Sequence, residues 1–456
     1  MINLILSFVS GLLLILAFPK FCVYPLAYVA LVPLLISIKR ARSIFGSVIC
    51  GALSGIVFFA GVLFWINTLS KWAGVWAVIA WIVLAICQSL FIAAFAGISK
   101  YVSIKFNKLE LILIPFIWTT VEWIRSLGPY GVTGGGLGYS QAGCLPVLQL
   151  AGIAGVYGIT FLVIFFNEAL AEDLFARKPR KIFLAILVLA VVIGFGYYRL
   201  HTFKVSGKAI NVAVIQGNIS QDTKLDYKYA FDIVSSQEAL SRKALLSTPD
   251  IVIWPETAVT TYLFDVEPIH SKIVNMIAGG NAFFLIGTPY RENDKIYNSV
   301  AAFAKDGRLI GRYDKQRLVP FGEYLPLRPI SYKLLGEDPL YAKDYNSNPK
   351  PKVIDLGITK AGVAICFEST FPYLVRDQVR RGAKFILVAT NDAWFFDSAA
   401  LYQHIQAAQM RAVENHIYVV QAANTGISAI IDPLGRVVKR TKSEQACVLS
   451  GRIYVH

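Results

Sequence analysis

The sequence is poor in the residues that bind metal ions. It holds five histidines and six cysteines, and contains neither an HExxH motif nor a CxxC pair. Structural zinc sites and disulfide frameworks need such groups at short, regular spacings. We therefore expect no metal ion, no disulfide framework and no cofactor.

Charged residues are also scarce, at 16% of the chain compared with about 25% in typical soluble domains. Residues 1–200 hold 14 Lys or Arg and 5 Asp or Glu, whereas residues 201–456 hold 30 and 24. The net charge of +15 would suit a nucleic-acid partner, but the basic residues of the first half lie between long apolar runs. Membrane orientation explains that pattern better, so we expect no nucleic acid.

Long uncharged runs in residues 1–200 predict a membrane domain of about seven helices, because a span needs about 20 apolar residues. Glu110, Glu122 and Arg125 interrupt the fifth run, which is the weakest. Glu122 and Arg125 are three residues apart, so they could form an interfacial ion pair or mark a functional site. The runs cover 2–18, 21–38, 43–70, 72–99, 109–125, about 145–167, and 182–198.

The loops between these runs predict the orientation of the chain. With a cytoplasmic N-terminus, the inner loops carry ten Lys or Arg and the outer loops carry three. This asymmetry follows the positive-inside rule. Seven spans then place residues 201–456 outside the cytoplasm.

Residues 201–456 predict an α/β or layered sandwich domain. Helical stretches at 225–245 and 403–415 alternate with short apolar runs bounded by Gly, Pro, Asn or Asp, as is typical of buried strands. The segment NSVAAFAKDGRLIGRYDK contains a Lys-Asp-Gly turn and predicts a hairpin. The strand-like runs are INVAVIQGN, DIVIWPE, FFLIGTPY, GVAICFE, KFILVATND, IYVVQAAN and ISAIIDPLG.

Polar residues follow the ends of several predicted strands. Glu256 follows IVIWP, Lys315 follows the hairpin, and Cys366 and Glu368 end GVAICFE. In layered α/β folds, sites assemble at strand ends and in the loops after them. These residues are therefore the candidates for a site.

A cysteine nucleophile needs a base to accept its proton, or a cation to lower its pKa. Glu256 could be the base for Cys366, and Lys315 could be the cation. Lys315 and the backbone N–H of Phe367 could also stabilise an oxyanion on an attacked carbonyl. The alternative is that Cys366 is a buried strand residue without a chemical role.

A second carboxylate, from Glu323 or Glu368, could hold the lysine in place.

With Glu256, Lys315 and Cys366 in this order, the chain resembles the nitrilase superfamily and its Glu-Lys-Cys triad. The string LVPFGEYLP and the membrane half narrow the resemblance, from residue 1 to about 450, to the apolipoprotein N-acyltransferase family.

The resemblance implies a multi-span helical domain over residues 1–200 and a nitrilase-like αββα sandwich over 201–456, on the periplasmic side of a bacterial inner membrane. It implies that an acyl chain moves from a phospholipid, typically phosphatidylethanolamine, to a thioester on Cys366. The chain then passes to the α-amino group of the diacylglyceryl-cysteine of an apolipoprotein. Glu256 is then the general base and Lys315 the oxyanion stabiliser, with Glu323 and Glu368 in support.

Four residues depart from the family's pattern: Leu225 where a tryptophan is common, Phe396 where glycine is usual, and His416 and Gln421 where arginines are usual. The family normally has one further span after the catalytic domain, and no apolar run of spanning length follows residue 201. Leu225 puts gating of the site by an aromatic residue in question. The missing last span does the same for the pose of the catalytic domain on the membrane.

Two other functions stay open from the residues. A membrane-tethered amidase of the nitrilase type would use the same triad on a small amide. An inactive membrane scaffold derived from the family would account for the departures at Leu225, Phe396, His416 and Gln421. The long apolar first half favours the acyltransferase, because its substrates are lipids.

Overall fold

The computed structural model describes residues 1–335, 344–350 and 352–456. Contacts within the chain divide it into two units. The first comprises Met1–Phe203 together with Ser398–Glu414, and the second comprises Lys204–Asp397 together with Asn415–His456. The chain therefore returns to the first unit for one helix. The sequence had suggested that this helix belongs to the α/β domain.

The first unit is helical. Among the residues that the structure describes, four helices are long and apolar enough to cross a membrane, namely α3, α5, α8 and α9. The helix α1 is apolar but shorter. The helices at two other predicted spans, α2 and α6, have only 9 and 16 residues. Its helices are α1 (Ile2–Leu16), α2 (Val32–Arg40), α3 (Ile44–Val62), α4 (Ser70–Ala73), α5 (Val75–Lys105), α6 (Glu110–Arg125), α7 (Leu145–Leu148), α8 (Ala151–Ala176), α9 (Lys181–Thr202) and α15 (Ala399–Asn415).

Small residues let these helices pack closely. A Cβ atom on Gly51 of α3 would lie 2.6 Å from the carbonyl oxygen of Ile92 in α5. One on Gly55 would lie 2.8 Å from the Cα atom of Ser89. Such glycine contacts are typical of helix pairs in membranes, where close backbone approach replaces the hydrophobic driving force.

The run 21–38 does not form one continuous helix. A short 3-10 segment, Tyr24–Tyr28, precedes the nine-residue helix α2. Pro25 and Pro33 each lie at the start of these segments. Proline lacks the N–H that an inner helical position must donate, so it begins helices and does not continue them.

The second unit contains two six-stranded sheets. The first has the order β12-β1-β2-β3-β4-β5, and the second has the order β11-β10-β9-β8-β7-β6. β1, β2 and β3 run parallel to one another, as do β7, β8 and β9. The strands are β1 (Lys208–Gln216), β2 (Ile251–Ile253), β3 (Phe283–Glu292), β4 (Lys295–Phe303), β5 (Leu309–Asp314), β6 (Ile354–Asp355), β7 (Lys360–Ile365), β8 (Phe385–Thr390), β9 (Tyr418–Ala423), β10 (Ala429–Ile431), β11 (Val437–Arg440) and β12 (Cys447–Val455).

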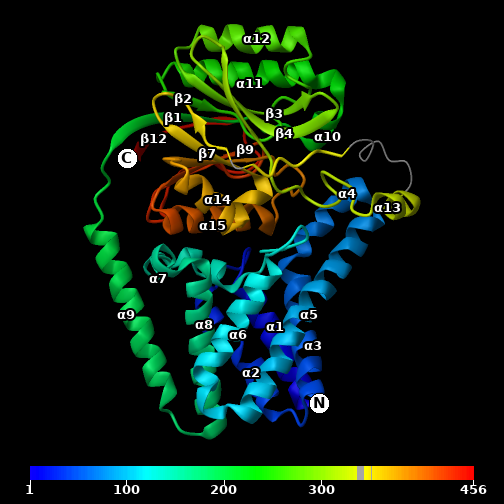
Figure 1. Ribbon diagram of the computed structural model, residues 1–456, viewed down its shortest axis with the longest axis vertical. Coiled ribbons are helices and arrows are strands. Elements are labelled where there is room, and N and C mark those ends of the chain that lie inside the picture. The colour runs from blue at the N-terminus through cyan, green and yellow to red at the C-terminus, as the bar shows by residue number, and fades with distance from the viewer. Residues whose placement is uncertain (336–343, 351) are drawn as a thin grey trace. The chain divides into compact units, whose positions relative to one another are not determined.

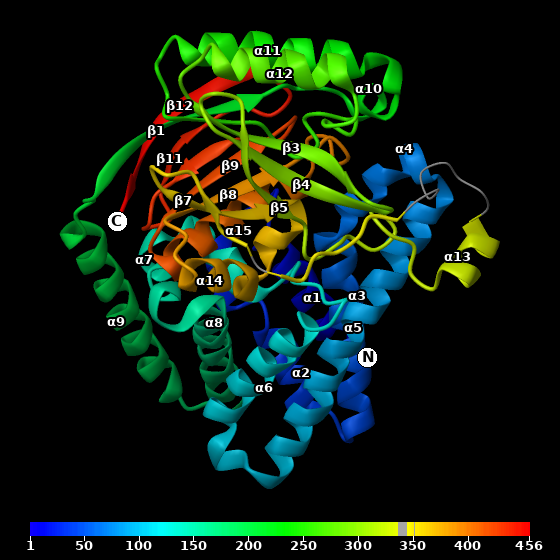
Figure 2. The same ribbon diagram turned by 45° about the horizontal axis from the view of Figure 1, so that its top comes forward.

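The two sheets pack face to face. Val212 and Leu285 of the first sheet share one buried cluster with Val363 and Leu387 of the second. On the outer face of the first sheet, α11 (Ala230–Leu245) and α12 (Glu267–Ala278) lie side by side, as both views show (Figure 1, Figure 2). α14 (Pro372–Arg380) packs on β7. The remaining helices are α10 (Gln221–Leu225) and α13 (Arg328–Leu335).

A helical region with apolar candidate spans and an α/β sandwich of two sheets confirm the predicted fold class. Every apolar run expected to be a strand contains one, and the predicted hairpin is β4–β5. The parallel strands also direct the loops that follow β2, β7 and β8 to sheet edges, where the candidate residues lie.

Candidate active site

Cys366 stands at the point where β7 ends and a short 3-10 helix, η7 (Cys366–Thr370), begins. Its backbone has a φ of 54°, in the left-handed region that non-glycine residues seldom adopt. The residue before it, Ile365, is fully buried, whereas Cys366 itself is half-buried. The sharp turn therefore lifts the thiol out of the strand, and strained backbone of this kind clusters at functional sites.

Lys315 follows the last residue of β5 and is almost fully buried, with 1% of its surface exposed. Its Nζ atom donates to Glu323 Oε1 at 2.9 Å and to Glu256 Oε1 at 3.3 Å. Burial alone would lower the pKa of Lys315, but the Glu323 and Glu256 carboxylates raise it above its usual range. The group is thus a fixed positive charge at neutral pH.

Glu256 follows β2 and is held at both carboxylate oxygens. Oε1 accepts from Lys315 and, at 2.8 Å, from Nδ2 of Asn298. Oε2 accepts from the backbone N–H of Asn391 at 2.9 Å. A carboxylate fixed in this way is oriented before any substrate arrives, as a positioned base must be.

Glu323 supports the lysine directly. Its Oε1 atom accepts from Lys315 and from Asn298 Nδ2 at 2.7 Å, and its Oε2 atom accepts from the N–H of Val319 at 2.8 Å. Asn298, in β4, therefore bridges both carboxylates. Sequence reasoning missed Asn298. Its signal in the sequence is weak, because it is a polar residue beside another, Ser299, in a short strand run.

Glu368 joins the cysteine turn to the lysine loop. Its carboxylate accepts from the N–H groups of Ile365, Gln316 and Arg317 at 2.8, 2.7 and 3.0 Å, and from the Tyr313 hydroxyl at 2.9 Å. Burial raises the pKa of Glu368 to about 7, against the hydrogen bonds that lower it. All four contacts are with groups of the protein itself. Glu368 is therefore placed to position the cysteine turn and the lysine loop.

A second buried lysine, Lys224, lies in α10 and was also missed. Its Nζ atom donates to Asn391 Oδ1 at 2.8 Å, Thr257 Oγ1 at 2.9 Å and the carbonyl oxygen of Glu256 at 3.2 Å. Burial lowers the pKa of Lys224 to about 7, against the attraction of Glu256. Lys224 therefore ties α10 to the two loops that hold the Glu256 carboxylate.

The Cys366 thiol is electrostatically coupled to the other candidates. Burial, and then the carboxylate of Glu256, raises its pKa well above the usual range, against the opposing effect of Lys315. The thiol is thus protonated at rest, and a base must accept its proton before the sulfur can attack. Glu256 is the carboxylate that contributes most to this coupling.

Phe367 begins the turn after the thiol. Its ring packs edge-to-face against Phe371, with ring centroids 4.9 Å apart. Its N–H group lies in the first turn of η7, where backbone donors have no partner within the helix. This N–H is suited to donate a hydrogen bond to a developing oxyanion.

The four residues that depart from the family's pattern lie in different local structures. Phe396 has a φ of 45°, which explains why a glycine suits this position better. His416 has a φ of 56° directly after α15. Gln421 is buried and donates to the carbonyl of Ile427 at 2.8 Å. Leu225 is 41% exposed, so this apolar side chain remains at the surface of its loop.

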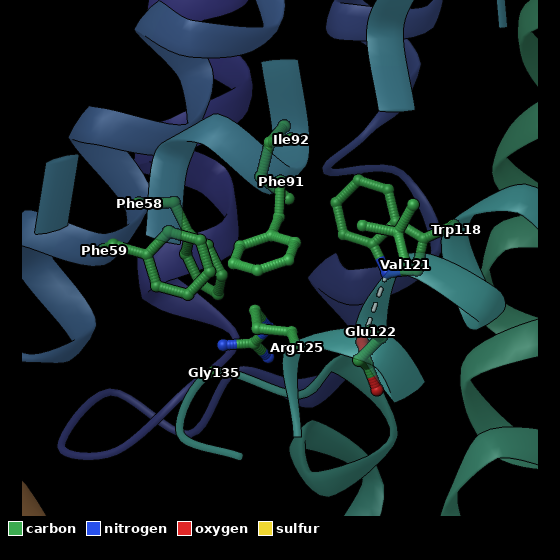
Figure 3. Close-up of a pocket in the computed structure, with 9 residues that line it drawn as sticks. All are labelled: Phe58, Phe59, Phe91, Ile92, Trp118, Val121, Glu122, Arg125 and Gly135. Atoms are coloured by element: carbon green, nitrogen blue, oxygen red, sulfur yellow. Dashed lines mark hydrogen bonds between the residues drawn. The ribbon is translucent and has the colours of Figure 1, made fainter. Parts of the chain in front are cut away.

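Glu122 and Arg125, in α6, are buried in the first unit and do not pair with each other as the spacing had suggested. Glu122 accepts from Trp118 Nε1 at 3.2 Å, and Arg125 donates to the carbonyl of Gly134 at 2.7 Å. Figure 3 shows Glu122 beside Trp118 and Arg125 beside Phe59 in a small pocket. Within the described residues no salt bridge joins the two side chains, and the glycine-rich loop after α6 supplies a partner for each, since Glu122 also accepts from the N–H of Leu137 at 3.0 Å.

Two family descriptions match the chain. Residues 10–169 match the apolipoprotein N-acyltransferase N-terminal domain, and residues 211–454 match the carbon-nitrogen hydrolase family. Among solved structures, Saccharomyces cerevisiae Nit3, of the nitrilase superfamily, aligns with 55% of this chain and 91% of its own, at 20% identity and a TM-score of 0.43.

Curated relatives match nearly the whole chain. The apolipoprotein N-acyltransferase of Geobacter metallireducens is 35% identical over 98% of this chain and 89% of its own length. That of Rickettsia prowazekii is 31% identical over 88% of this chain and 82% of its own length. That of Haemophilus influenzae is 30% identical over 95% of this chain and 85% of its own length.

The long apolar helices of the first unit and the match of residues 211–454 to the carbon-nitrogen hydrolase family define a membrane protein of the carbon-nitrogen hydrolase class. Its likeness to curated relatives runs through both units. The chain belongs to the apolipoprotein N-acyltransferase family.

Proposed function

We propose that this protein transfers an acyl chain from a phospholipid, through a thioester on Cys366, to the α-amino group of an apolipoprotein's diacylglyceryl-cysteine. Phosphatidylethanolamine is the expected donor. The observation that carries the proposal is Lys315, buried between Glu256 and Glu323 and coupled to the Cys366 thiol. The α/β unit would face the periplasm from a bacterial inner membrane, as the charge of the loops predicts.

In the first half-reaction, Glu256 accepts the thiol proton while the Cys366 sulfur attacks the ester carbonyl of the phospholipid. Lys315 and the N–H of Phe367 stabilise the oxyanion of the tetrahedral intermediate. The C–O bond then breaks, and Glu256 returns its proton to the leaving oxygen, which releases a lysophospholipid. The acyl chain remains on the sulfur as a thioester.

In the second half-reaction, the free amine of the diacylated cysteine attacks the thioester carbonyl. Glu256 accepts a proton from the amine, and the same donors stabilise the second oxyanion. The C–S bond breaks, the sulfur recovers the proton, and the amide product leaves. Glu323 and Glu368 act through Lys315 and through the loops that they hold.

The test uses the purified full-length protein and phosphatidylethanolamine with a labelled acyl chain. We expect a labelled, hydroxylamine-sensitive adduct on wild-type protein and none on Cys366→Ala. Adding a synthetic diacylated lipopeptide should move the label to its N-terminus. Absence of the thioester together with turnover of a small amide would support the amidase instead. Rescue of acyltransferase-depleted cells by both wild type and Cys366→Ala would support the scaffold. The near full-length similarity to N-acyltransferases favours neither the amidase nor the scaffold.

A further inference from the structure

A pocket of about 550 Å³ lies at the end of the first unit where α5 joins α6 and α8 joins α9. Its volume is in the range of small-ligand sites. Its polar lining carries more basic than acidic groups, with four lysines and two glutamates. These are Lys39, Lys100, Lys108, Lys181, Glu110 and Glu172.

The acidic groups of this pocket are neutralised from within the protein. The Nζ atom of Lys39, whose side chain is 7% exposed, contacts the Glu110 carboxylate and lies 2.8 Å from Glu168 Oε1. Lys181 forms an ion pair with Glu172. Three glutamate carboxylates lie within 4.8 Å of one another, close enough to hold a cation, but the Lys39 ammonium already supplies that charge.

Two lysines are left without a carboxylate partner. Lys100 donates to the backbone carbonyl of Lys39 at 3.0 Å. Lys108 is exposed, and within the described part of the chain no side-chain partner is found for it. With Glu168 included, the four lysines outnumber the three glutamates by one, and Lys100 and Lys108 are the two lysines that no carboxylate holds. Lysine is a common ligand of phosphate groups.

The pocket also has an apolar side. Ile104 and Phe175 line it and are 63% and 54% exposed. Both belong to helices long and apolar enough to cross a membrane, α5 and α8. Basic groups beside exposed apolar side chains match a phospholipid better than a free anion, because a phospholipid has both a phosphate and acyl chains. Basic pockets between membrane helices are known to bind anionic headgroups.

We propose that this pocket binds the phosphate headgroup of an anionic phospholipid, with Lys100 and Lys108 on the phosphate and Ile104 and Phe175 beside the acyl chains. The site is separate from the acyl-transfer site along the chain. α9 begins in the pocket at Lys181 and ends at Thr202, just before the second unit begins. Its 22 residues rise about 33 Å, which is about the thickness of a bilayer core. The pocket therefore lies about one bilayer-core thickness from the far end of α9.

The test is native mass spectrometry of the full-length protein with phosphatidylglycerol and phosphatidylcholine of equal chain length. We expect wild type to prefer phosphatidylglycerol, and Lys100→Gln/Lys108→Gln to bind it roughly thirtyfold more weakly, at about 1 kcal/mol for each lysine. Lys100→Arg/Lys108→Arg should keep the preference. Lys108→Gln alone, at a side chain without a partner, should show part of the loss if the double variant folds poorly.

The matched control is Lys105→Gln/Lys178→Gln, which removes the same charge near the same end without touching the pocket lining. Equal losses in the control and in the pocket variant would mean general attraction to the membrane and would overturn the proposal. Unchanged phosphatidylglycerol binding in the pocket variant would do the same. Displacement of the lipid by excess inorganic phosphate would assign the pocket to a soluble anion.

Discussion

Replacing Lys315 by methionine removes an ammonium group from between two buried carboxylates and keeps most of the side-chain volume. In the wild type, Nζ is 2.9 Å from Glu323 Oε1 and 3.3 Å from Glu256 Oε1. Only Asn298 would then bridge the two carboxylates. We expect Lys315→Met to lose thioester formation and also to lose stability at pH 8.

The structure sets the size of that loss. Glu256 Oε1 and Glu323 Oε1 both accept from Asn298 Nδ2, at 2.8 and 2.7 Å. They therefore lie within about 6 Å of each other, where two unit charges repel by about 3 kcal/mol at an effective dielectric constant of 20. Removing one partner of a buried ion pair costs about 3–5 kcal/mol in other proteins. We expect a loss of that order.

The loss should depend on pH in a defined direction. Without Lys315, repulsion raises the pKa of one carboxyl in the folded variant above its unfolded value of about 4.3. Between the unfolded pKa and the raised folded pKa, the folded state binds more protons than the unfolded state. The variant's stability therefore increases as pH falls from 8 to 5. In the wild type, the raised pKa of Lys315 gives a contribution that is constant over this range and is lost only above about pH 10.5.

The assay is the melting temperature of the full-length protein in detergent at pH 5 and pH 8, followed by intrinsic fluorescence. Lys315→Met/Glu323→Gln is the matched control. It should regain part of the stability at pH 8, because one of the repelling charges is gone, but no activity. A Lys315→Met variant that melts like wild type at pH 8, or a double variant that regains nothing, would refute the electrostatic reasoning.

Two further predictions concern stability. Because burial lowers the pKa of Lys224 to about 7, the unfolded chain binds more protons between about pH 7 and 10.5, and wild-type stability should rise there by up to about 1.4 kcal/mol per pH unit. Melting curves at pH 7 and 9 should show this rise in wild type and not in Lys224→Met. Glu414→Gln should cost about 3–5 kcal/mol, because it leaves buried Arg411, 3.0 Å from Glu414 Oε2, without its counter-charge. Arg411→Met/Glu414→Leu should melt closer to wild type, and equal melting of Glu414→Gln and wild type would contradict this.

The sequence predicts the second unit well because its signals are local. Seven of its strands are short apolar runs bounded by turn residues, and Glu256, Cys366 and Asn391 follow such runs directly. The strands β6, β11 and β12 lack this pattern and were not predicted. Lys315 and Glu256 are far apart in the chain. Their places after predicted strands made both of them candidates, and the resemblance to a known family joined them with Cys366 as a triad. The catalytic roles of these residues stay predictions until the variants are tested.

Other features depend on neighbours that no local pattern reveals. Asn298 looks like an ordinary strand residue, and its importance comes from two carboxylates on other loops. Glu122 and Arg125 have the spacing of an ion pair, yet a glycine-rich loop and other helices supply better partners. The run 21–38 has the length of a span, but two prolines divide it.

The return of the chain to the first unit at α15 affects the order in which the protein can be completed. Ala407, Met410 and Val413 of α15 belong to the same buried cluster as residues of α1, α3 and α8. Glu414 accepts the N–H of Val156 at 2.8 Å, and Gln403 donates to the carbonyl of Val62 at 3.0 Å. During synthesis, the helical unit therefore keeps an unfilled face until the ribosome has passed residue 414. A fragment that ends near residue 203 would retain that open face permanently, so the end of the last long apolar helix is not a natural place to divide this protein.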